Sequence, residues 1–249
     1  MKNIKMIATD LDDTLLCRDK TIGDYTAKVL RRVRERGVLL VFATARSLEG
    51  SQEYRDLLSP DGDIVTGGCL VFAGGQLLCC HYLPEPRGAE LIAELCARPS
   101  IWRVSARSLE VGYSNVPTKG KIHVDFKSVM PEKLIHCSCG TDDGVFMKSI
   151  AARYPEFSFL HNSKSDIWDI NPKEATKQNG IRAISKHFNI HLSEIAAFGD
   201  DFSDVAMLRE CGIGVAMSNA IGECKAVADC VCGDCDCDGV AKWLEQNVL

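Results

Sequence analysis

Short apolar runs alternate with amphipathic stretches at both ends of the chain. Residues 5–9 and 38–42 are such runs, and an unbroken apolar run is typical of a strand buried on both faces of a parallel sheet. Between them, apolar residues recur at helical spacing over 22–33. The alternation returns near the C-terminus, where the pattern predicts a helix over 174–188 and a buried strand over 195–198. Both ends of the chain therefore predict one sheet of βα units.

Start and stop signals refine these elements. Gly37 stands where the first helix would end, because glycine is favoured just past a helix C-terminus. Ser47 is a candidate N-cap for a second helix that runs through Leu58. A strand is expected over 63–66, followed by a hairpin that turns at residues 74–75.

The pattern changes at residues 83–86, which read Leu-Pro-Glu-Pro. After a predicted helix over 87–97, apolar residues alternate with polar ones, as in a sheet with one face packed and the other solvated or against a partner. The predicted strands are 102–106, 109–114, 122–127 and 133–138, and a further helix is expected over 142–154. We therefore predict an α+β domain over 84–167, inserted into an α/β core domain formed by 1–83 and 168–249.

Composition narrows the class of protein. Of the 249 residues, 46% are hydrophobic and 25% are charged, which is ordinary for a globular protein and excludes a disordered or collagen-like chain. The net charge of −5 argues against a general nucleic-acid binder, which needs a basic surface. No apolar run approaches the ~20 residues that cross a bilayer, and the first residues lack the apolar region of a signal peptide. We expect a soluble, cytoplasmic protein with no nucleic-acid or membrane partner, and the oligomeric state is left open.

Polar side chains directly follow three of the predicted buried strands. Asp10 and Asp12 follow the first strand, Thr44 follows the second, and Asp200 and Asp204 follow the last. In an open parallel sheet, ligands bind outside the carboxyl ends of the strands. Carboxylates gathered at that edge repel one another unless a cation lies among them.

A hard cation fits this set of ligands. Carboxylate oxygens with few histidines nearby favour Mg²⁺ over zinc, and Mg²⁺ held in this way commonly implies a phosphate substrate. A lysine is then expected to complete the neutralisation of charge, and Lys177, at the start of the helix over 174–188, is the best-placed candidate. Each residue alone is more simply explained as a cap, a turn or a surface residue. Their joint order at strand ends and helix starts favours one shared site.

These motifs resemble a known enzyme superfamily. The four signature motifs of the haloacid dehalogenase (HAD) superfamily are similar to Asp10-Leu-Asp12-Asp13-Thr14, Thr44, Lys177 and Gly199-Asp200-Asp201-x-Ser203-Asp204. The position of the insert and the late segments 214–219 and 238–240 are similar to its Cof-type branch, which has a C2-type cap. The resemblance covers nearly the whole chain and is weakest in the insert. It implies a Rossmann-like parallel-sheet core with an inserted α+β cap domain, and a Mg²⁺-dependent phosphohydrolase.

The resemblance also implies a role for each residue of the shared site. Asp10 would be the nucleophile that accepts the phosphoryl group as an aspartyl phosphate. Asp12 would protonate the leaving alcohol and then activate water, while its backbone carbonyl binds the metal. Lys177 would stabilise the negative charge of the nucleophile and the phosphate. Asp200 would bind Mg²⁺ directly together with Asp10 and Asp12, and Asp204 would support either the metal or the lysine.

Thr44, Arg46 and Asn219 are the residues expected to bind the substrate. Thr44 would hydrogen-bond a phosphate oxygen, Arg46 lies two residues further on, and Asn219 matches a position that often lines the phosphate site. The expected substrate is a small phosphorylated metabolite, such as a sugar phosphate or a similar phosphomonoester. Its identity is left open, because the cap contacts the leaving group in this architecture.

Three positions depart from the family pattern. Asp13 stands where glycine is frequent, and Ser203 replaces a usual asparagine, so that a contact is lost or bridged by water. Gly67-Gly68 stands where Asn-Gly is usual, which removes a side chain that commonly touches the phosphate or the cap. These departures bear on affinity or specificity and not on the nucleophile.

The chain has 13 cysteines, an odd number that disulfides do not pair completely. A cytosolic location would keep most of them as thiols, and those inside apolar stretches serve as small hydrophobic residues. Four of them are interleaved with aspartates near the C-terminus, unlike the spaced pairs of zinc sites: Cys230, Cys232, Cys235 and Cys237. Free thiols with an exposed loop are the favoured interpretation, and a structural metal or a redox disulfide stays open.

Other functions are compatible with parts of this pattern. A phosphotransferase such as a mutase would pass the phosphoryl group to another sugar. A non-catalytic phospho-ligand-binding regulator, such as a receiver domain, lacks an acid/base two residues after its phosphoacceptor, so Asp12 favours an enzyme. A redox or metal-storage protein would depend on the tail cysteines alone.

Overall fold

The computed structural model describes residues 3–162 and 164–249, and the chain forms two compact units. The first unit combines Met1–Cys79 with Thr176–Leu249, and the second is the segment Cys80–Ala175 between them. The predicted limits of the insert, 84 and 167, lie inside these bounds. The C-terminal limit differs because the strand that begins at Ile167 pairs within the sheet of the second unit.

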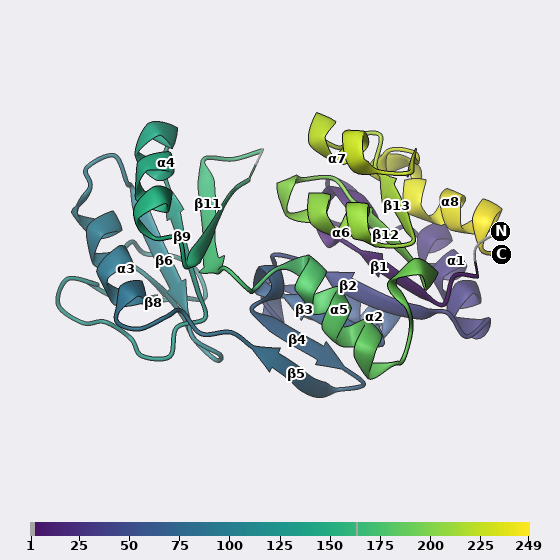
Figure 1. The fold of residues 1–249 in the computed structure, drawn as a ribbon, viewed down its shortest axis with the longest axis horizontal. Helices are drawn as coiled ribbons and strands as arrows, with labels where there is room; N and C mark the ends of the chain where they lie inside the picture. Colours follow the sequence, from purple (N-terminus) through teal and green to yellow (C-terminus); the bar gives the residue numbers. More distant parts are fainter. Residues whose placement is uncertain (1–2, 163) are drawn as a thin grey trace. The chain divides into compact units, whose positions relative to one another are not determined.

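Eight strands form the sheet of the first unit (Figure 1). Their order across the sheet is β14 (Cys230–Val231), β13 (Ile213–Ala216), β12 (Ile195–Gly199), β1 (Met6–Thr9), β2 (Leu39–Ala43), β3 (Gly62–Val65), β4 (Leu70–Ala73) and β5 (Gln76–Cys80). Neighbours from β14 to β3 pair in parallel, whereas β3 and β4 are antiparallel. Every residue of β1 and β12 is buried, as their apolar runs predict. The parallel-dominated α/β fold is thereby confirmed.

Two groups of helices enclose these buried strands. One group is α1 (Asp24–Glu35) with α2 (Gln52–Leu58) and α8 (Gly239–Asn247), and the other is α6 (Val205–Glu210) with α5 (Lys177–His187) and α7 (Gly222–Val227). The largest fully buried side chains of the sheet include Phe42 and Phe198. Among the residues that the structure describes, no helix is long and apolar enough to cross a membrane.

The predicted helix signals are present, with one shift. Gly37 follows α1 at a φ of 80°, a left-handed conformation that glycine adopts without strain. Ser47 does not cap α2 itself. Its Oγ accepts a hydrogen bond from the Gly50 backbone N–H (3.1 Å), at the start of a 3₁₀ turn over Glu49–Ser51 that leads into the α-helix.

The second unit has a six-stranded sheet and two helices. The order of its strands is β10 (Phe157–His161), β11 (Ile167–Pro172), β9 (His136–Gly140), β6 (Arg103–Arg107), β7 (Gly112–Ser114) and β8 (Ile122–His123). Neighbours are antiparallel except β7 with β8. The helices α3 (Arg87–Ala97) and α4 (Gly144–Arg153) pack on the sheet, where Leu91 and Met147 join Val104 in an apolar cluster.

One alternating stretch of the second unit is not the strand that its pattern predicts. The strand predicted over 122–127 ends at His123. Beyond it the backbone turns at Asp125, whose Oδ1 accepts a hydrogen bond from the Lys127 N–H (3.0 Å). A local side-chain bond to the backbone thus competes with sheet pairing and wins.

Candidate active site

The three strands predicted to deliver the site residues are neighbours in the core sheet. β1 lies between β12 and β2, and all three run parallel. Asp10 follows β1, Thr44 follows β2 and Asp200 follows β12, and all three residues are buried. Because parallel strands end at the same edge, the structure gathers these residues where ligands bind in open α/β folds.

Lys177 joins two carboxylates in a buried ion cluster. Its Nζ lies 2.7 Å from Oδ1 of Asp10 and 2.6 Å from Oδ1 of Asp204. The lysine side chain is 2% exposed, that of Asp10 is 9% and that of Asp204 is 0%. Thr176 determines where α5 begins, because its Oγ1 accepts a hydrogen bond from the Asn179 backbone N–H (3.1 Å). Lys177 is therefore the first helical residue and lies next to the strand ends.

Asp204 is held by contacts to both of its oxygens. Oδ2 accepts hydrogen bonds from the backbone N–H groups of Asp200 (2.9 Å) and Asp201 (3.1 Å), while Oδ1 faces Lys177. Gly199 allows this close packing, since a Cβ at that position would lie 2.4 Å from Cβ of Asp204. With both oxygens engaged, Asp204 is better suited to position its neighbours than to bind a metal directly.

Thr14 fixes the carboxylate of Asp200. Its hydroxyl donates to Oδ1 of Asp200 at 2.9 Å, and both residues are buried. Thr14 was not among the predicted site residues. Its position four residues after Asp10, at the end of the first motif, is the signal that could have identified it.

The buried centre holds more negative than positive charge. Burial raises the pKa of Asp10 well above its ordinary value; Lys177 opposes this rise, whereas Asp204 and Asp200 add to it. Burial also disfavours the ammonium of Lys177, but the attraction of Asp10 and Asp204 prevails and raises its pKa. Among the described residues of this cluster there are three carboxylates and one ammonium, which contacts two of them.

These residues fit a divalent metal ion. Oxygens of Asp10, Asp200 and Asp204 all lie within 4.8 Å of one another. Carboxylate oxygens are the ligands that Mg²⁺ prefers in proteins, and a bound cation would offset their mutual repulsion. Because Asp204 is engaged on both oxygens, Asp10 and Asp200 are the carboxylates better placed to bind the ion.

Asp12 lies in a second cluster that is more exposed. Its carboxylate forms a bidentate pair with Arg46 (Nε–Oδ2 2.7 Å, Nη2–Oδ1 2.9 Å) and an ion pair with Lys20 (3.0 Å). Burial opposes ionisation, but the hydrogen bonds from Arg46 and Lys20 prevail and lower the pKa of Asp12. Arg46, predicted to bind substrate, is thus engaged by Asp12. Lys20 was not predicted, and no motif points to it.

Thr44 and Asn219, the other predicted substrate-binding residues, differ in their surroundings. Oγ1 of Thr44 accepts a hydrogen bond from the Arg46 backbone N–H (3.1 Å), which leaves the hydroxyl proton for an acceptor such as a phosphate oxygen. The amide of Asn219 joins two loops, because it donates to the Asp13 carbonyl (2.7 Å) and accepts from the Cys235 N–H (3.1 Å). Asn219 thus positions the loop after β1, and a substrate contact stays a prediction.

The structure shows the surroundings of the three positions that depart from the family pattern. Asp13 has a φ of 58°, a left-handed conformation that aspartate tolerates better than most side chains. Gly67, which replaces the usual asparagine, has a φ of 65°. Its neighbour Gly68, where glycine is usual, has a φ of 107°, and a Cβ there would lie 2.5 Å from the backbone of Thr176, so only glycine fits beside the start of α5. Ser203 reaches Oδ1 of Asp204 at 3.5 Å, the weak contact expected of a short side chain.

The cysteine-rich tail has its own source of positive charge. All the cysteines are free thiols, and Cys235 is buried, so the loop is only partly exposed. Cys235, Asp234 and Asp236 form a group that could hold a metal ion. Arg18, however, forms ion pairs with both aspartates. An arginine neutralises these carboxylates, which supports the interpretation of free thiols.

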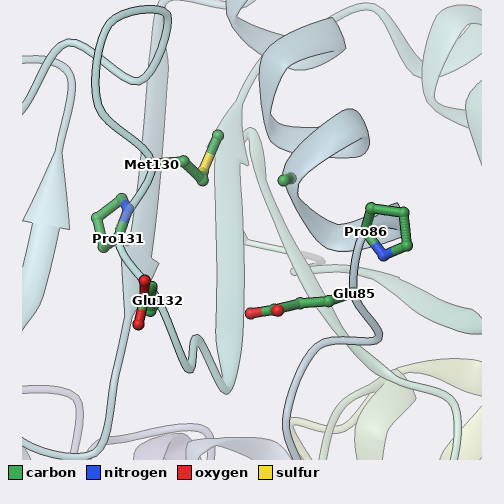
Figure 2. Close-up of a pocket in the computed structure, with 6 residues that line it drawn as sticks. Glu85, Pro86, Met130, Pro131 and Glu132 are labelled. Atoms are coloured by element: carbon green, nitrogen blue, oxygen red, sulfur yellow. The ribbon is translucent and has the colours of Figure 1, made fainter.

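A pocket in the second unit contains none of the predicted site residues (Figure 2). Its volume is about 470 Å³, and it is lined by Glu85, Pro86, Ala89, Met130, Pro131 and Glu132. The side chain of Glu85 extends across the pocket toward Glu132. Two carboxylates in its lining would repel a phosphate, so this pocket is a poor candidate for the reaction centre.

Comparison with known proteins defines the class of this enzyme. A sequence model of the haloacid dehalogenase-like hydrolases matches residues 7–244, and the chain belongs to this family. Relatives that are named as phosphatases match nearly the whole length of this chain. The protein is therefore a phosphatase of the HAD type, a phosphoric monoester hydrolase. The resemblance drawn from the motifs is confirmed, and a non-catalytic regulator or a metal-storage protein is set aside.

Individual relatives show how far the similarity extends. A Haemophilus influenzae protein, whose name assigns it phosphatase activity provisionally, is 28% identical, with 98% of both chains covered. The HMP-PP phosphatase of Klebsiella pneumoniae is 28% identical and covers 96% of this chain and 94% of its own length. A solved structure described as a HAD subclass IIB sugar phosphatase has a TM-score of 0.87 at 24% identity, covering 97% of this chain and 98% of that one. That structure shares the fold.

Proposed function

We propose that this phosphatase hydrolyses a small phosphorylated metabolite, a sugar phosphate or similar phosphomonoester, with Mg²⁺ and through an aspartyl-phosphate intermediate. The observation that carries the proposal is the buried cluster of Asp10, Asp200 and Asp204, in which the Lys177 ammonium contacts Asp10 and Asp204. A relative of similar length that is named HMP-PP phosphatase supports a small phosphorylated substrate.

Asp10 is the proposed nucleophile. Its ionised carboxylate attacks phosphorus, so that a new O–P bond forms as the bond to the leaving alcohol breaks. Lys177, 2.7 Å from Oδ1 of Asp10, stabilises the ionised carboxylate and the charge that arrives with the phosphoryl group. Asp204 holds Lys177 on one oxygen and the backbone of Asp200 on the other, so these groups are in place before the substrate binds.

Asp10, Asp200 and the backbone carbonyl of Asp12 would hold the magnesium ion. The ion supplies positive charge that offsets the repulsion between the nucleophile and the phosphate. Thr14 keeps the carboxylate of Asp200 in one orientation through its hydrogen bond to Oδ1. Thr44 donates its hydroxyl proton to a phosphate oxygen at the end of the neighbouring strand.

Asp12 is the proposed acid and base. It protonates the leaving alcohol and then takes a proton from the water that hydrolyses the aspartyl phosphate. Arg46 and Lys20 favour its ionised form, which is the form that the second step needs. The first step needs the protonated form, so Asp12 has to release one of these partners when the substrate binds.

The segment predicted as 84–167, which is bounded by Cys80 and Ala175 in the structure, is the proposed cap domain of this enzyme. The nucleophile, the acid/base, the lysine and the metal-binding carboxylates all belong to the first unit, so the second is not needed for the chemistry itself. We assign to it the recognition of the part of the substrate that leaves as the alcohol.

A panel of phosphorylated metabolites, assayed for phosphate release with and without Mg²⁺, tests the proposal. The wild-type enzyme should release phosphate from members of the panel, EDTA should abolish the release, and Mg²⁺ should restore it. Asp10→Asn keeps the size of the side chain but removes the attacking charge, so turnover should fall by several orders of magnitude. Asp56→Asn, in the exposed part of α2, is the matched control and should keep normal turnover.

Each part of the proposal can fail separately. Near-normal turnover in Asp10→Asn would exclude this residue as the nucleophile. Turnover that persists in EDTA would exclude the metal. A melting temperature of Asp10→Asn close to that of the wild type shows that a loss of activity is chemical and not a loss of fold.

A further inference from the structure

The turn that follows β3 has an unusual backbone. Three consecutive residues have positive φ angles, namely Thr66 (51°), Gly67 (65°) and Gly68 (107°). Glycine adopts such angles without strain, whereas a β-branched residue at a positive φ is a true outlier. Within the part of the chain that the structure describes, Thr66 is the one β-branched residue with a positive φ. A strained residue persists only where its surroundings enforce the conformation, and such residues gather at functional sites.

The hydroxyl of Thr66 is buried without a partner. The residue is 3% exposed, and its Oγ1 forms no hydrogen bond with any residue that the structure describes. Buried polar atoms are nearly always satisfied by protein, water or a ligand, and an unsatisfied one costs free energy. Thr66 therefore combines a strained backbone with an unpaired hydroxyl. A glycine at this position would remove both costs, so the turn itself does not explain why a threonine is there.

Backbone hydrogen bonds join this turn to the end of β2. The N–H of Thr66 donates to the Arg46 carbonyl (2.7 Å), and the N–H of Gly67 donates to the Thr44 carbonyl (3.0 Å). β2 and β3 are parallel neighbours in the sheet. Thr66 therefore lies at the same edge of the sheet as Thr44, at the end of the next strand.

The other side of the turn packs against the start of α5. A Cβ at Gly68 would lie 2.5 Å from the backbone of Thr176, the residue directly before Lys177. The turn that carries Thr66 thus connects the strand end that carries Thr44 with the helix start that carries Lys177. All of these residues belong to the first unit.

We propose that the hydroxyl of Thr66 donates a hydrogen bond to an oxygen of the phosphoryl group, which makes Thr66 a further substrate-binding residue. The inference rests on the proposed function, since its ligand is the group that this function removes. A hydroxyl is a suitable donor to a charged phosphate oxygen. The bound phosphoryl group satisfies the hydroxyl that the free enzyme leaves unpaired, so the cost carried by the free enzyme is recovered on binding.

Thr66→Val is the variant that tests this contact, because it keeps the β-branched shape and removes the hydroxyl. Loss of a hydrogen bond to a charged group should lower kcat/KM by about 10- to 100-fold. The melting temperature of the free enzyme should rise by about 2 °C, since an unpaired buried hydroxyl is removed at the same time. Thr66→Ser keeps the hydroxyl and should keep kcat/KM within a few-fold of the wild type.

Thr26→Val is the matched control. Thr26 is also 3% exposed, but its hydroxyl donates to Oδ1 of Asp238 at 2.7 Å. Removal of a hydroxyl that has a partner leaves the carboxylate without its donor. The control should therefore show the opposite pattern, a lower melting temperature with normal kcat/KM.

Inorganic phosphate tests the contact without turnover. Calorimetric titration in Mg²⁺ should show that Thr66→Val binds phosphate about 10- to 100-fold more weakly than the wild type. The loss in kcat/KM should be of similar size for every substrate in the panel, because the phosphoryl group is common to all of them. Phosphate affinity that depends on Thr66, in a wild-type enzyme that releases no phosphate from the panel, would overturn the proposed function and leave the contact standing.

Three results would overturn Thr66 as a residue that binds the phosphoryl group. The first is unchanged kcat/KM and unchanged phosphate affinity in Thr66→Val, which would assign the hydroxyl to a bound water. The second is a loss confined to some substrates with unchanged phosphate affinity, which would assign it to the leaving group. The third is an equal loss in Thr66→Ser and Thr66→Val, which would assign the effect to the turn and not to the hydroxyl.

Discussion

The two units of this protein gather charged side chains in different ways. In the first, three carboxylates outnumber the ammonium of Lys177 where β1 and β12 end. In the second, Lys121 lies beside Arg107 and near Arg103 and Asp169, over the polar side of β6. Carboxylates that are held together away from water cost free energy until a cation binds among them. The cluster of the first unit therefore fits a metal cation, whereas the cluster of the second unit mixes both signs of charge.

The two regions also differ in how firmly their side chains are held. Lys177 is 2% exposed and has ion pairs of 2.6 and 2.7 Å. Arg103 and Lys121 are only partly buried, beside the exposed ring of Trp102. Chemistry at phosphorus needs atoms fixed to a fraction of an ångström, which short buried contacts provide.

The largest effect outside the nucleophile is expected at Asp12, on the exposed side of the catalytic centre. Asp12→Asn keeps the backbone carbonyl but loses the acid, so kcat on an alkyl phosphate should fall by about 10²–10⁴-fold. The loss on p-nitrophenyl phosphate should be smaller, because nitrophenolate departs without a proton. Steady-state kinetics on both substrates measure this difference. Equal losses would contradict the role of Asp12 and confine the chemistry to the buried cluster.

A smaller effect is expected at Asp204. A variant at this position distinguishes a residue that holds its neighbours in place from a residue that binds the metal. Asp204→Asn weakens the hold on Lys177 and on the backbone of Asp200, so kcat should fall on the order of 100-fold. Saturating Mg²⁺ should not restore it, because the lysine is no longer held. Full recovery of kcat at high Mg²⁺ would make Asp204 a metal ligand. Asp56→Asn again serves as the control.

The smallest effect concerns the contribution of Lys121 to the stability of the second unit. The pKa of Lys121 is lowered in the folded protein, so its charged form is less favourable there than in the unfolded chain. Lys121→Met should therefore raise the melting temperature at pH 7 by about 2 °C. The gain should shrink as the pH rises toward 10.5, the ordinary lysine value, where the charge is lost in both states. Thermal denaturation followed by circular dichroism measures both, and a lower melting temperature at pH 7 would make Lys121 a structural residue.

The main features of the core site could be predicted because they are local in the chain. An unbroken apolar run locates a buried strand, and the polar residue that follows it lies at the sheet edge, as for Asp10, Thr44 and Asp200. Which partner each long side chain selects is not a local property. The pairing of Arg46 with Asp12 could not be predicted, because the strand-end pattern does not specify the direction of a side chain, and a substrate contact of Arg46 stays a prediction.

The approach of Lys121 to Arg107 could not be predicted, for a related reason. Lys121 precedes β8 without a recognisable motif, and its approach to Arg107 depends on how β6 pairs with β7. A period-two pattern indicates which residues share a side of one strand, but not the register between strands. The strand wrongly extended through residue 127 shows the same limit, since the turn at Asp125 depends on a single side chain.

The close approach of Thr176 to Gly68 has a consequence for how such an enzyme diversifies. The chain leaves the core sheet at Cys80 and returns at Thr176, whose backbone packs against Gly68 of the core itself. Lys177 follows at once, so the core and not the intervening segment sets its position. Sequence changes, insertions or wholesale replacement between these two points would leave the catalytic lysine where it is. Natural selection is thereby free to alter which compound is hydrolysed while the means of hydrolysis is inherited intact.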